Sequence, residues 1–220
     1  MVKQFDPILY VVTDRSWLNG KRFVDQVEQA ILGGATMVQL REKNISTRDF
    51  INMAAEVKQV TTRYGIPLII NDRLDIALAV DAAGLHVGQD DMPALTARRL
   101  LGPGKILGVS VANVAEAVQA EKDGADYLGA GAVFPTGTKN DAGYVECREL
   151  ERITGGVAIP VVAIGGINET NMPMLKTSGI QGIAVVSAIF AKNDPRKAAE
   201  NLKRMAGEII GACACKETGG

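Results

Sequence analysis

The chain contains 220 residues, of which 47% are hydrophobic, 5% are aromatic and 24 are glycine. This composition is typical of one compact domain with an aliphatic core and many short turns. The net charge of −1, from 24 basic and 25 acidic residues, excludes a global field that would recruit nucleic acid or an anionic membrane. Any anion must therefore be bound by local groups.

The N-terminal segment has one short apolar run, which ends at the polar residues 13–15. The run is too short for a secretion signal or a membrane span, which predicts a cytoplasmic protein. The three cysteines, Cys147, Cys213 and Cys215, have neither the spacing of a metal site nor the even count of a disulfide framework. The segment 213–220 is small and polar, and we expect it to be a disordered tail without an assigned function.

Eight short runs rich in Ile, Val and Leu follow along the chain, separated by longer segments of helical periodicity. The predicted strands are Ile8–Thr13, Thr36–Arg41, Pro67–Asn71, Gly84–Val87, Lys105–Val109, Ala125–Gly129, Pro160–Ile164 and Gly182–Val186. The first helical stripe ends at Gly33 and Gly34, since glycine commonly terminates a helix. The last helix has a cap and an N1 proline at Asp194 and Pro195.

The predicted strands are apolar along their whole length, which favours a parallel sheet covered by helices on one face and filled by side chains on the other. Eight such units predict a closed (β/α)8 TIM barrel, with a single domain over residues 1–212. A doubly wound open sheet is the alternative, but it would need fewer strands and usually a phosphate-binding fingerprint after the first one. Residues 13–17, after the first strand, have no such pattern.

In a barrel of this kind, ligands bind at the carboxyl ends of the strands. Asp72 and Asp91 follow the third and fourth predicted strands, and neighbouring strands lie about 4.8 Å apart, so the two carboxylates could converge on one cation. Either residue could instead cap a helix, as the position of Asp91 before Met92 and Pro93 suggests. With no Cys or His cluster nearby, the oxygen ligands favour a hard ion such as Mg²⁺.

Arg41 and Lys43 alternate with Gln39 on one face of the second strand and its end. Two interpretations are open for these cations. They could form a surface ion pair with Glu42, or they could face the barrel mouth and bind a diphosphate.

A second anion site is predicted after the last two strands, where barrels commonly hold a phosphate on backbone N–H groups. The chain has Gly165-Gly166 and Val186-Ser187 at these points. The glycine pair could equally be a tight turn. The segment 136–139 after the sixth strand adds hydroxyls and a cation that could close over the phosphate. Two separate anion sites indicate two substrates or one bisphosphate.

The stretches VQLREK, INDRLDIALAVDAAGLHVGQDDMP, GVS, DYLGAGAVFPTGTKNDA, AIGGI and VVSAI occur in this order. Together they closely resemble thiamine-phosphate synthase, from Leu9 to about Ile210. The resemblance implies a transferase that joins 4-amino-2-methyl-5-(diphosphooxymethyl)pyrimidine to the nitrogen of 4-methyl-5-(2-phosphooxyethyl)thiazole and releases diphosphate. It also implies small-molecule substrates and one Mg²⁺ per subunit. It leaves the oligomeric state open.

The resemblance also assigns residues to roles. It places Mg²⁺ on Asp72 and Asp91, and the catalytic roles on Arg41, Lys43, Ser110 and Lys139. The contacts that it implies are Gln39, Leu40, Arg41, Glu42, Lys43, Asn71 and Ser110 for the pyrimidine diphosphate, and Thr136, Gly137, Thr138, Lys139, Gly166, Val186 and Ser187 for the thiazole phosphate. The sequence departs from the family at residues 143–147, where a proline-containing stretch is usual.

The chain has one histidine, His86, and no cysteine at a strand end, so a paired nucleophile and base are not expected. A dissociative mechanism needs neither, because the aminopyrimidine spreads the positive charge left by the diphosphate and the thiazole nitrogen attacks with its own lone pair. His86 is expected to be a hydrogen-bonding support. Two alternatives are a thiazole tautomerase, which needs no diphosphate site, and a noncatalytic phosphate sensor, which gives magnesium no role.

Overall fold

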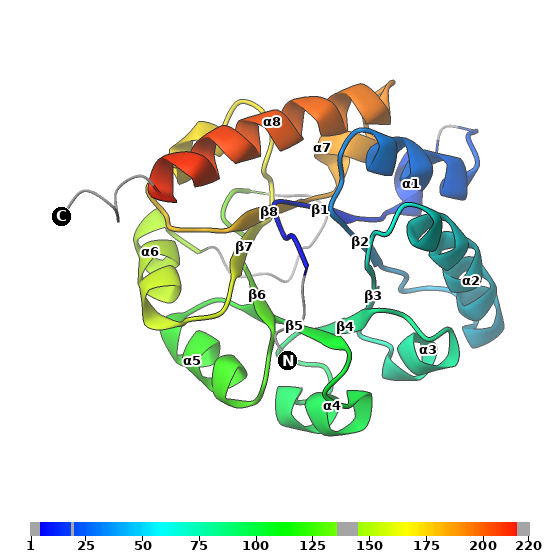
Figure 1. Cartoon of the computed structure of the whole chain (residues 1–220), viewed down its shortest axis with the longest axis horizontal. Coiled ribbons are helices and arrows are strands. Elements are labelled where there is room, and N and C mark those ends of the chain that lie inside the picture. Colours follow the sequence, from blue (N-terminus) through cyan, green and yellow to red (C-terminus); the bar gives the residue numbers. More distant parts are fainter. Residues whose placement is uncertain (1–4, 19, 136–144, 215–220) are drawn as a thin grey trace.

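The computed structural model of the chain describes residues 5–18, 20–135 and 145–214, with side chains as far as Ile210. Eight strands pair in parallel and in chain order, and the last closes the barrel against the first (Figure 1). They are β1 (Leu9–Val12), β2 (Met37–Leu40), β3 (Leu68–Asn71), β4 (Gly84–Val87), β5 (Ile106–Val111), β6 (Tyr127–Ala130), β7 (Val161–Ile164) and β8 (Gly182–Val185). The predicted TIM barrel is confirmed, and no strand end differs from its predicted position by more than two residues.

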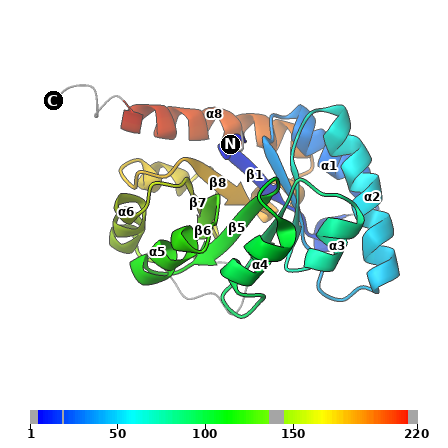
Figure 2. The same ribbon diagram turned by 60° about the horizontal axis from the view of Figure 1, so that its bottom comes forward.

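Helices surround the barrel on its outer face (Figure 2). They are α1 (Phe23–Leu32), α2 (Thr47–Arg63), α3 (Leu74–Ala79), α4 (Ala94–Leu101), α5 (Val114–Lys122), α6 (Cys147–Gly156), α7 (Ser187–Phe190) and α8 (Pro195–Ala214), with 3-10 turns η1 (Arg15–Trp17) and η2 (Met172–Leu175). Side-chain caps begin α2, α5 and α8, where the predicted cap Asp194 accepts through Oδ1 from Lys197 N at 3.0 Å. Ser46 Oγ accepts from Asp49 N at 3.1 Å before α2, and Asn113 Oδ1 accepts from Glu116 N at 2.9 Å before α5.

Alternate strand residues point to opposite faces of the barrel wall. In β1, Leu9 and Val11 belong to the layer under the helices, whereas Tyr10 and Val12 belong to the barrel interior. The interior is filled by Tyr10, Val12, Met37, Ile69, Ile106, Tyr127, Val162 and Ala184. Both faces of the wall are buried, which accounts for strands that are apolar along their whole length.

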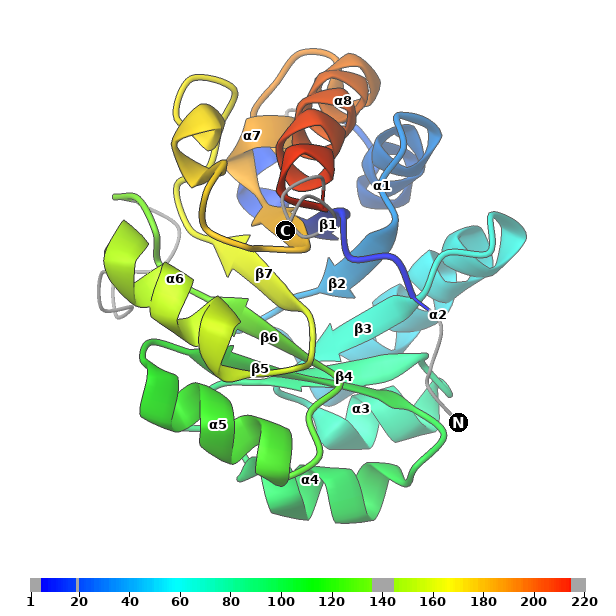
Figure 3. The ribbon, with the colours of Figure 1, turned by 60° about the vertical axis from the view of Figure 1, so that its left-hand side comes forward.

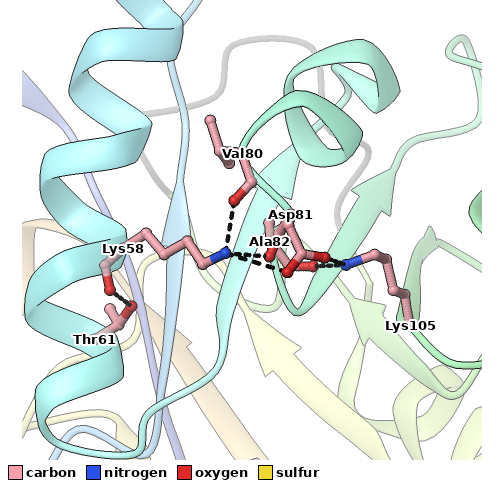
Figure 4. A network of polar contacts seen from close by, with 6 residues as sticks. All are labelled: Lys58, Thr61, Val80, Asp81, Ala82 and Lys105. Carbon is pink, nitrogen blue, oxygen red and sulfur yellow. Dashed lines mark hydrogen bonds and ion pairs between the residues drawn. The ribbon is translucent and has the colours of Figure 1, made fainter.

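A polar network around Asp81 holds the amino-terminal end of the barrel (Figure 4). Lys58 of α2 donates from Nζ to the carbonyl oxygens of Val80 and Asp81, each at 2.8 Å. Lys105, just before β5, donates to Ala82 O at 2.6 Å and pairs with the Asp81 carboxylate. The hydrogen bond from Lys105 lowers the pKa of Asp81. The network ties α2, the α3–β4 turn and β5 together, at the barrel end opposite to the predicted ligand sites.

Helix α8 packs beside α1 (Figure 3) and continues to Ala214. It therefore extends two residues into the segment 213–220, for which we expected no order. The reason is that extending an existing helix adds a hydrogen bond for each residue without a new nucleation cost. Residues 215–220 lie outside the described residues. No helix in the described ranges is long and apolar enough to cross a membrane.

Candidate active site

Two adjoining cavities open at the carboxyl ends of the strands. The first, which we call the acidic cavity, is lined by Lys43, Asp72, Asp90 and Asp91 among others. The second, the apolar cavity, is lined by residues 164–167 and 184–187 among others. Arg41, Asn71, Ser110 and Gly131 line both cavities. Since these residues are shared, ligands in the two cavities would lie next to each other.

Asp72 and Asp91 line the acidic cavity together. Asp72 has a left-handed backbone, with φ at 60°, and its N–H donates to His86 O at 2.8 Å, which continues the pairing of β3 with β4. Asp91 closes a turn, because its Oδ2 accepts from Gly88 N at 2.8 Å. The N-cap residues of α3 and α4 are Arg73 and Pro93, so neither carboxylate lies at a helix cap position. The alternative in which these carboxylates cap helices is therefore wrong.

The donors of the acidic cavity suit a hard cation. Its wall contains carboxylates and amide oxygens but no thiol or imidazole, and such oxygen ligands are those that Mg²⁺ prefers. In the described part of the chain, no group of three or more His, Cys, Asp or Glu residues could hold a metal ion. A magnesium ion bound to Asp72 and Asp91 would therefore take most of its ligands from water and from a substrate.

The two cations at the end of β2 are not paired with Glu42. Arg15 holds that carboxylate through two hydrogen bonds of 2.8 Å, from Nε to Oε1 and from Nη2 to Oε2. Arg41 and Lys43 form no ion pair within the described ranges, and Arg41 Nε is buried there without a hydrogen-bond partner. The surface ion-pair alternative is therefore wrong. A buried N–H without an acceptor is costly, and an anion bound at this point would supply one.

Alternate residues of β2 point to opposite faces of the barrel wall, and this alternation decides which of them face a ligand. Gln39 and Arg41 line the apolar cavity, whereas Leu40 is fully buried in the layer under the helices. Glu42 is held by Arg15 and its side chain is 6% exposed. Of the predicted contacts, Leu40 and Glu42 therefore have only backbone groups left for a substrate.

A chain of hydrogen bonds crosses the barrel and includes three residues that line the apolar cavity, Gln39, His86 and Ser110. Gln39 Nε2 donates to Tyr10 OH at 2.8 Å, and Tyr10 OH lies 2.8 Å from Tyr127 OH. Tyr127 OH lies 2.9 Å from His86 Nδ1. His86 Nε2 in turn lies 2.9 Å from Ser110 Oγ. The expected role of His86 as a hydrogen-bonding support is confirmed by these contacts.

Sequence reasoning missed the two tyrosines of this chain, because a tyrosine inside an apolar strand is ordinarily a core residue. Burial raises the pKa of Tyr10 and Tyr127 above the usual value, so both hydroxyls keep their protons at neutral pH. The signal that could have found them is their inward position in β1 and β6. A polar group at such a position needs a partner inside the barrel.

The glycine pair after β7 forms part of the wall of the apolar cavity. Gly165 and Gly166 have φ values of 102° and 65°, a region that favours glycine. A Cβ on Gly166 would lie 2.4 Å from Pro135 O, so that position has no room for a side chain. Val186 and Ser187 line the same cavity. The turn thus exposes backbone to the cavity, and the two interpretations of the glycine pair are compatible.

The predicted phosphate site also includes the segment 136–139. Thr136, Gly137, Thr138 and Lys139 lie outside the described residues, as do 143 and 144 of the segment that departs from the family. The chain is described again from Val145, whose N–H donates to Ala132 O at 2.8 Å. Cys147 then begins α6.

The comparisons with known proteins agree on one family. A family described as thiamine monophosphate synthase matches residues 9–189. A thiamine-phosphate synthase from Clostridium tetani is 53% identical over 200 residues, which cover 91% of this chain and 96% of that protein. One from Ruminiclostridium cellulolyticum is 54% identical over 202 residues, or 92% of this chain and 96% of that protein.

A solved structure is also similar. The thiamine phosphate pyrophosphorylase from Pyrococcus furiosus aligns with a TM-score of 0.85 and 45% identity, over 93% of this chain and 97% of that chain. The similarity therefore spans the barrel and both of its cavities. On this sequence and structural similarity, the chain belongs to the thiamine monophosphate synthase family.

Proposed function

We propose that this protein is a thiamine-phosphate synthase that joins the pyrimidine diphosphate to the thiazole phosphate. The observation that carries the proposal is the position of Arg41, whose buried Nε has no partner in the described part of the chain and which lines both cavities. The acidic cavity, which also holds Lys43, suits a diphosphate with a divalent cation. The apolar cavity suits a heterocyclic ring. The family relatives are named for this activity.

We assign Mg²⁺ to Asp72 and Asp91 as its protein ligands. Their place in one cavity with oxygen donors only supports this assignment. When bound, the ion would neutralise charge on the diphosphate.

The protein's own groups act on a reaction that breaks one bond and forms another. As the bond between the methylene carbon and the diphosphate oxygen breaks, both electrons leave with the diphosphate, and Arg41 and Lys43 stabilise the growing charge. Gln39 and Ser110 orient the aminopyrimidine through hydrogen bonds. The thiazole nitrogen then forms the new C–N bond with its lone pair, so no residue has to remove a proton.

The second substrate is assigned to the apolar cavity. Backbone groups of Gly166, Val186 and Ser187 would hold its phosphate, as the geometry of the glycine turn supports. Lys139, outside the described residues, is assigned to the region between the two anions. Replacing Lys139 should lower turnover more than substrate affinity, and a pure loss of affinity would reduce it to a binding residue.

Release of diphosphate tests this function directly. With both substrates present, we expect diphosphate to form in the presence of Mg²⁺ and to stop when the metal is chelated. A thiazole tautomerase would release none under either condition, and a phosphate sensor would bind its ligand without turnover. The cytoplasmic location and the absence of membrane and nucleic-acid partners stay predictions from the sequence.

A further inference from the structure

The hydrogen-bond chain from Gln39 to Ser110 has a direction that its chemistry sets. An amide nitrogen can only donate, so the Tyr10 oxygen accepts from Gln39 Nε2. Tyr10 has one proton of its own, and its other hydrogen-bond partner among the described residues is Tyr127 OH. Tyr10 therefore donates to Tyr127.

The same assignment of donors and acceptors extends to the imidazole of His86. Tyr127 accepts from Tyr10, so its own proton goes to His86 Nδ1. With Nδ1 acting as the acceptor, the proton of the neutral ring is on Nε2, which donates to Ser110 Oγ. Ser110 then keeps its own O–H for a ligand, and it lines both cavities.

The opposite direction leaves a buried proton without an acceptor. If His86 donated from Nδ1, Tyr127 would have to donate to Tyr10. The Tyr10 proton would then face Gln39 Nε2, which is itself a donor. Tyr10 and Tyr127 are 2% and 0% exposed, so water cannot accept this proton, and a stranded buried donor is costly. A doubly protonated imidazole fails for the same reason.

Two glycines make room for this chain inside the barrel. A Cβ on Gly108 of β5 would lie 2.1 Å from Tyr127 Cζ, and a Cβ on Gly129 of β6 would lie 3.2 Å from His86 Cε1. The rings of Tyr10 and Tyr127 meet edge to face, with centroids 5.7 Å apart. The barrel interior therefore holds the hydroxyls and the imidazole in one arrangement.

We propose that His86 is a positioning residue. The hydrogen-bond chain from Gln39 through both tyrosines, which we call the relay, holds the His86 ring as the Nε2–H tautomer. This tautomer keeps Ser110 a hydrogen-bond donor to the substrate. The part that concerns the substrate rests on the proposed function. The acceptor selected in this way is a lone pair of the pyrimidine diphosphate, either on a ring nitrogen or on a diphosphate oxygen. A ligand with an N–H at that point could use only the remaining lone pair of Ser110 Oγ and would leave the O–H without an acceptor, so it should bind less well.

Nitrogen-15 NMR of the imidazole tests the tautomer without any substrate. His86 is the only histidine in the sequence, so labelled histidine gives one ring to interpret. We expect a protonated Nε2 and an unprotonated Nδ1 at neutral pH. Tyr127→Phe removes the donor to Nδ1 and should give a mixture of tautomers. Tyr64→Phe, which removes an exposed tyrosine hydroxyl bound to Glu28, is the matched control and should keep the original pattern.

A protonated Nδ1 in the unmodified protein overturns the proposal, whether or not the protein is active. An unchanged pattern in Tyr127→Phe also overturns it, since the relay would then not hold the tautomer. Tyr10→Phe interrupts the relay one bond earlier and serves as the second variant if Tyr127→Phe does not fold.

Steady-state kinetics test the link between His86 and Ser110. Tyr127→Phe should lower kcat about tenfold with little change in KM, the size expected for one lost buried hydrogen bond. In a Ser110→Ala background, Tyr127→Phe should have no further effect, because the tyrosine acts only through the serine. If the two substitutions lowered kcat by factors that multiply in the double variant, the positioning role would be overturned. Absence of diphosphate release by the unmodified protein would instead count against the proposed function, and the NMR result would stand.

Discussion

Arg15 and Glu42 form a two-point ion pair at the mouth of the barrel, with both hydrogen bonds 2.8 Å long. They follow two neighbouring strands, β1 and β2. The Glu42 side chain is only 6% exposed, and it lies in the chain between the two cations that we assign to the diphosphate. Arg15 therefore keeps this carboxylate from competing with a substrate anion for Arg41 and Lys43.

Removing Arg15 should weaken binding of the pyrimidine diphosphate. Arg15→Met leaves a poorly exposed carboxylate uncompensated beside the anion site, and we expect KM for this substrate to rise about tenfold with a smaller change in kcat. Adding Glu42→Gln to Arg15→Met removes the unpaired charge and should recover most of the affinity. Kinetics with varied pyrimidine diphosphate measure both effects. An unchanged KM in Arg15→Met would contradict the role given to the pair.

Removing one carboxylate should show whether the acidic cavity holds the metal. Asp72→Asn keeps the size of the side chain but removes its charge, and we expect turnover to fall by about a hundredfold or more at limiting magnesium. Asp90→Asn, in the same cavity but not assigned as a ligand, is the matched comparison and should lower turnover much less. Titration of activity with Mg²⁺ separates weaker metal binding from slower chemistry. Near-normal turnover of Asp72→Asn at limiting magnesium would refute the assignment.

A methyl group on the glycine turn should damage the thiazole phosphate site. Gly166→Ala places a Cβ 2.4 Å from Pro135 O in a left-handed backbone, and we expect about 1–3 kcal/mol less unfolding free energy. KM for thiazole phosphate should also rise at least about tenfold, because the wall of the cavity must move. Gly155→Ala in α6 meets no atom within 4 Å and should be neutral or slightly stabilising. If Gly166→Ala and Gly155→Ala had the same unfolding free energy and the same KM for thiazole phosphate, the role given to the glycine turn would be contradicted.

The barrel and the location of its site could be predicted because their signals are local. Glycines and polar residues mark each strand end, and eight apolar runs of similar length favour one architecture. The carboxyl ends of the strands then bring together residues such as Asp72 and Asp91, which are far apart in the sequence.

The interior of the barrel could not be predicted in the same way. A strand that is buried on both faces lacks the alternation that would show which residues point inward, so Tyr10 and Tyr127 could not be told from ordinary core residues. The prediction also ended the fifth strand at Val109, whereas β5 continues through Ser110 to Val111. The pair of Arg15 with Glu42 joins residues 27 positions apart, a contact that no local pattern indicates.

The buried tyrosines predict a loss of stability at high pH. Burial raises the pKa of Tyr10 and Tyr127 in the folded protein, whereas an unfolded tyrosine ionises near pH 10. Above that pH the unfolded chain releases protons that the folded protein retains, which favours unfolding. Each contribution is fully present below about pH 10 and is lost as the pH rises towards the folded-state pKa, by up to about 1.4 kcal/mol per pH unit for each residue.

Urea unfolding at a series of pH values between about 9 and 11.5 measures this loss of stability. Tyr127→Phe removes one of the two ionisations, so its unfolding free energy should fall less steeply with pH even though the variant is less stable at neutral pH. An equally steep decline in Tyr127→Phe would show that this hydroxyl ionises in the folded protein as readily as in the unfolded chain. The direction of the hydrogen bonds from Gln39 to Ser110 would then be lost at high pH before the barrel unfolds.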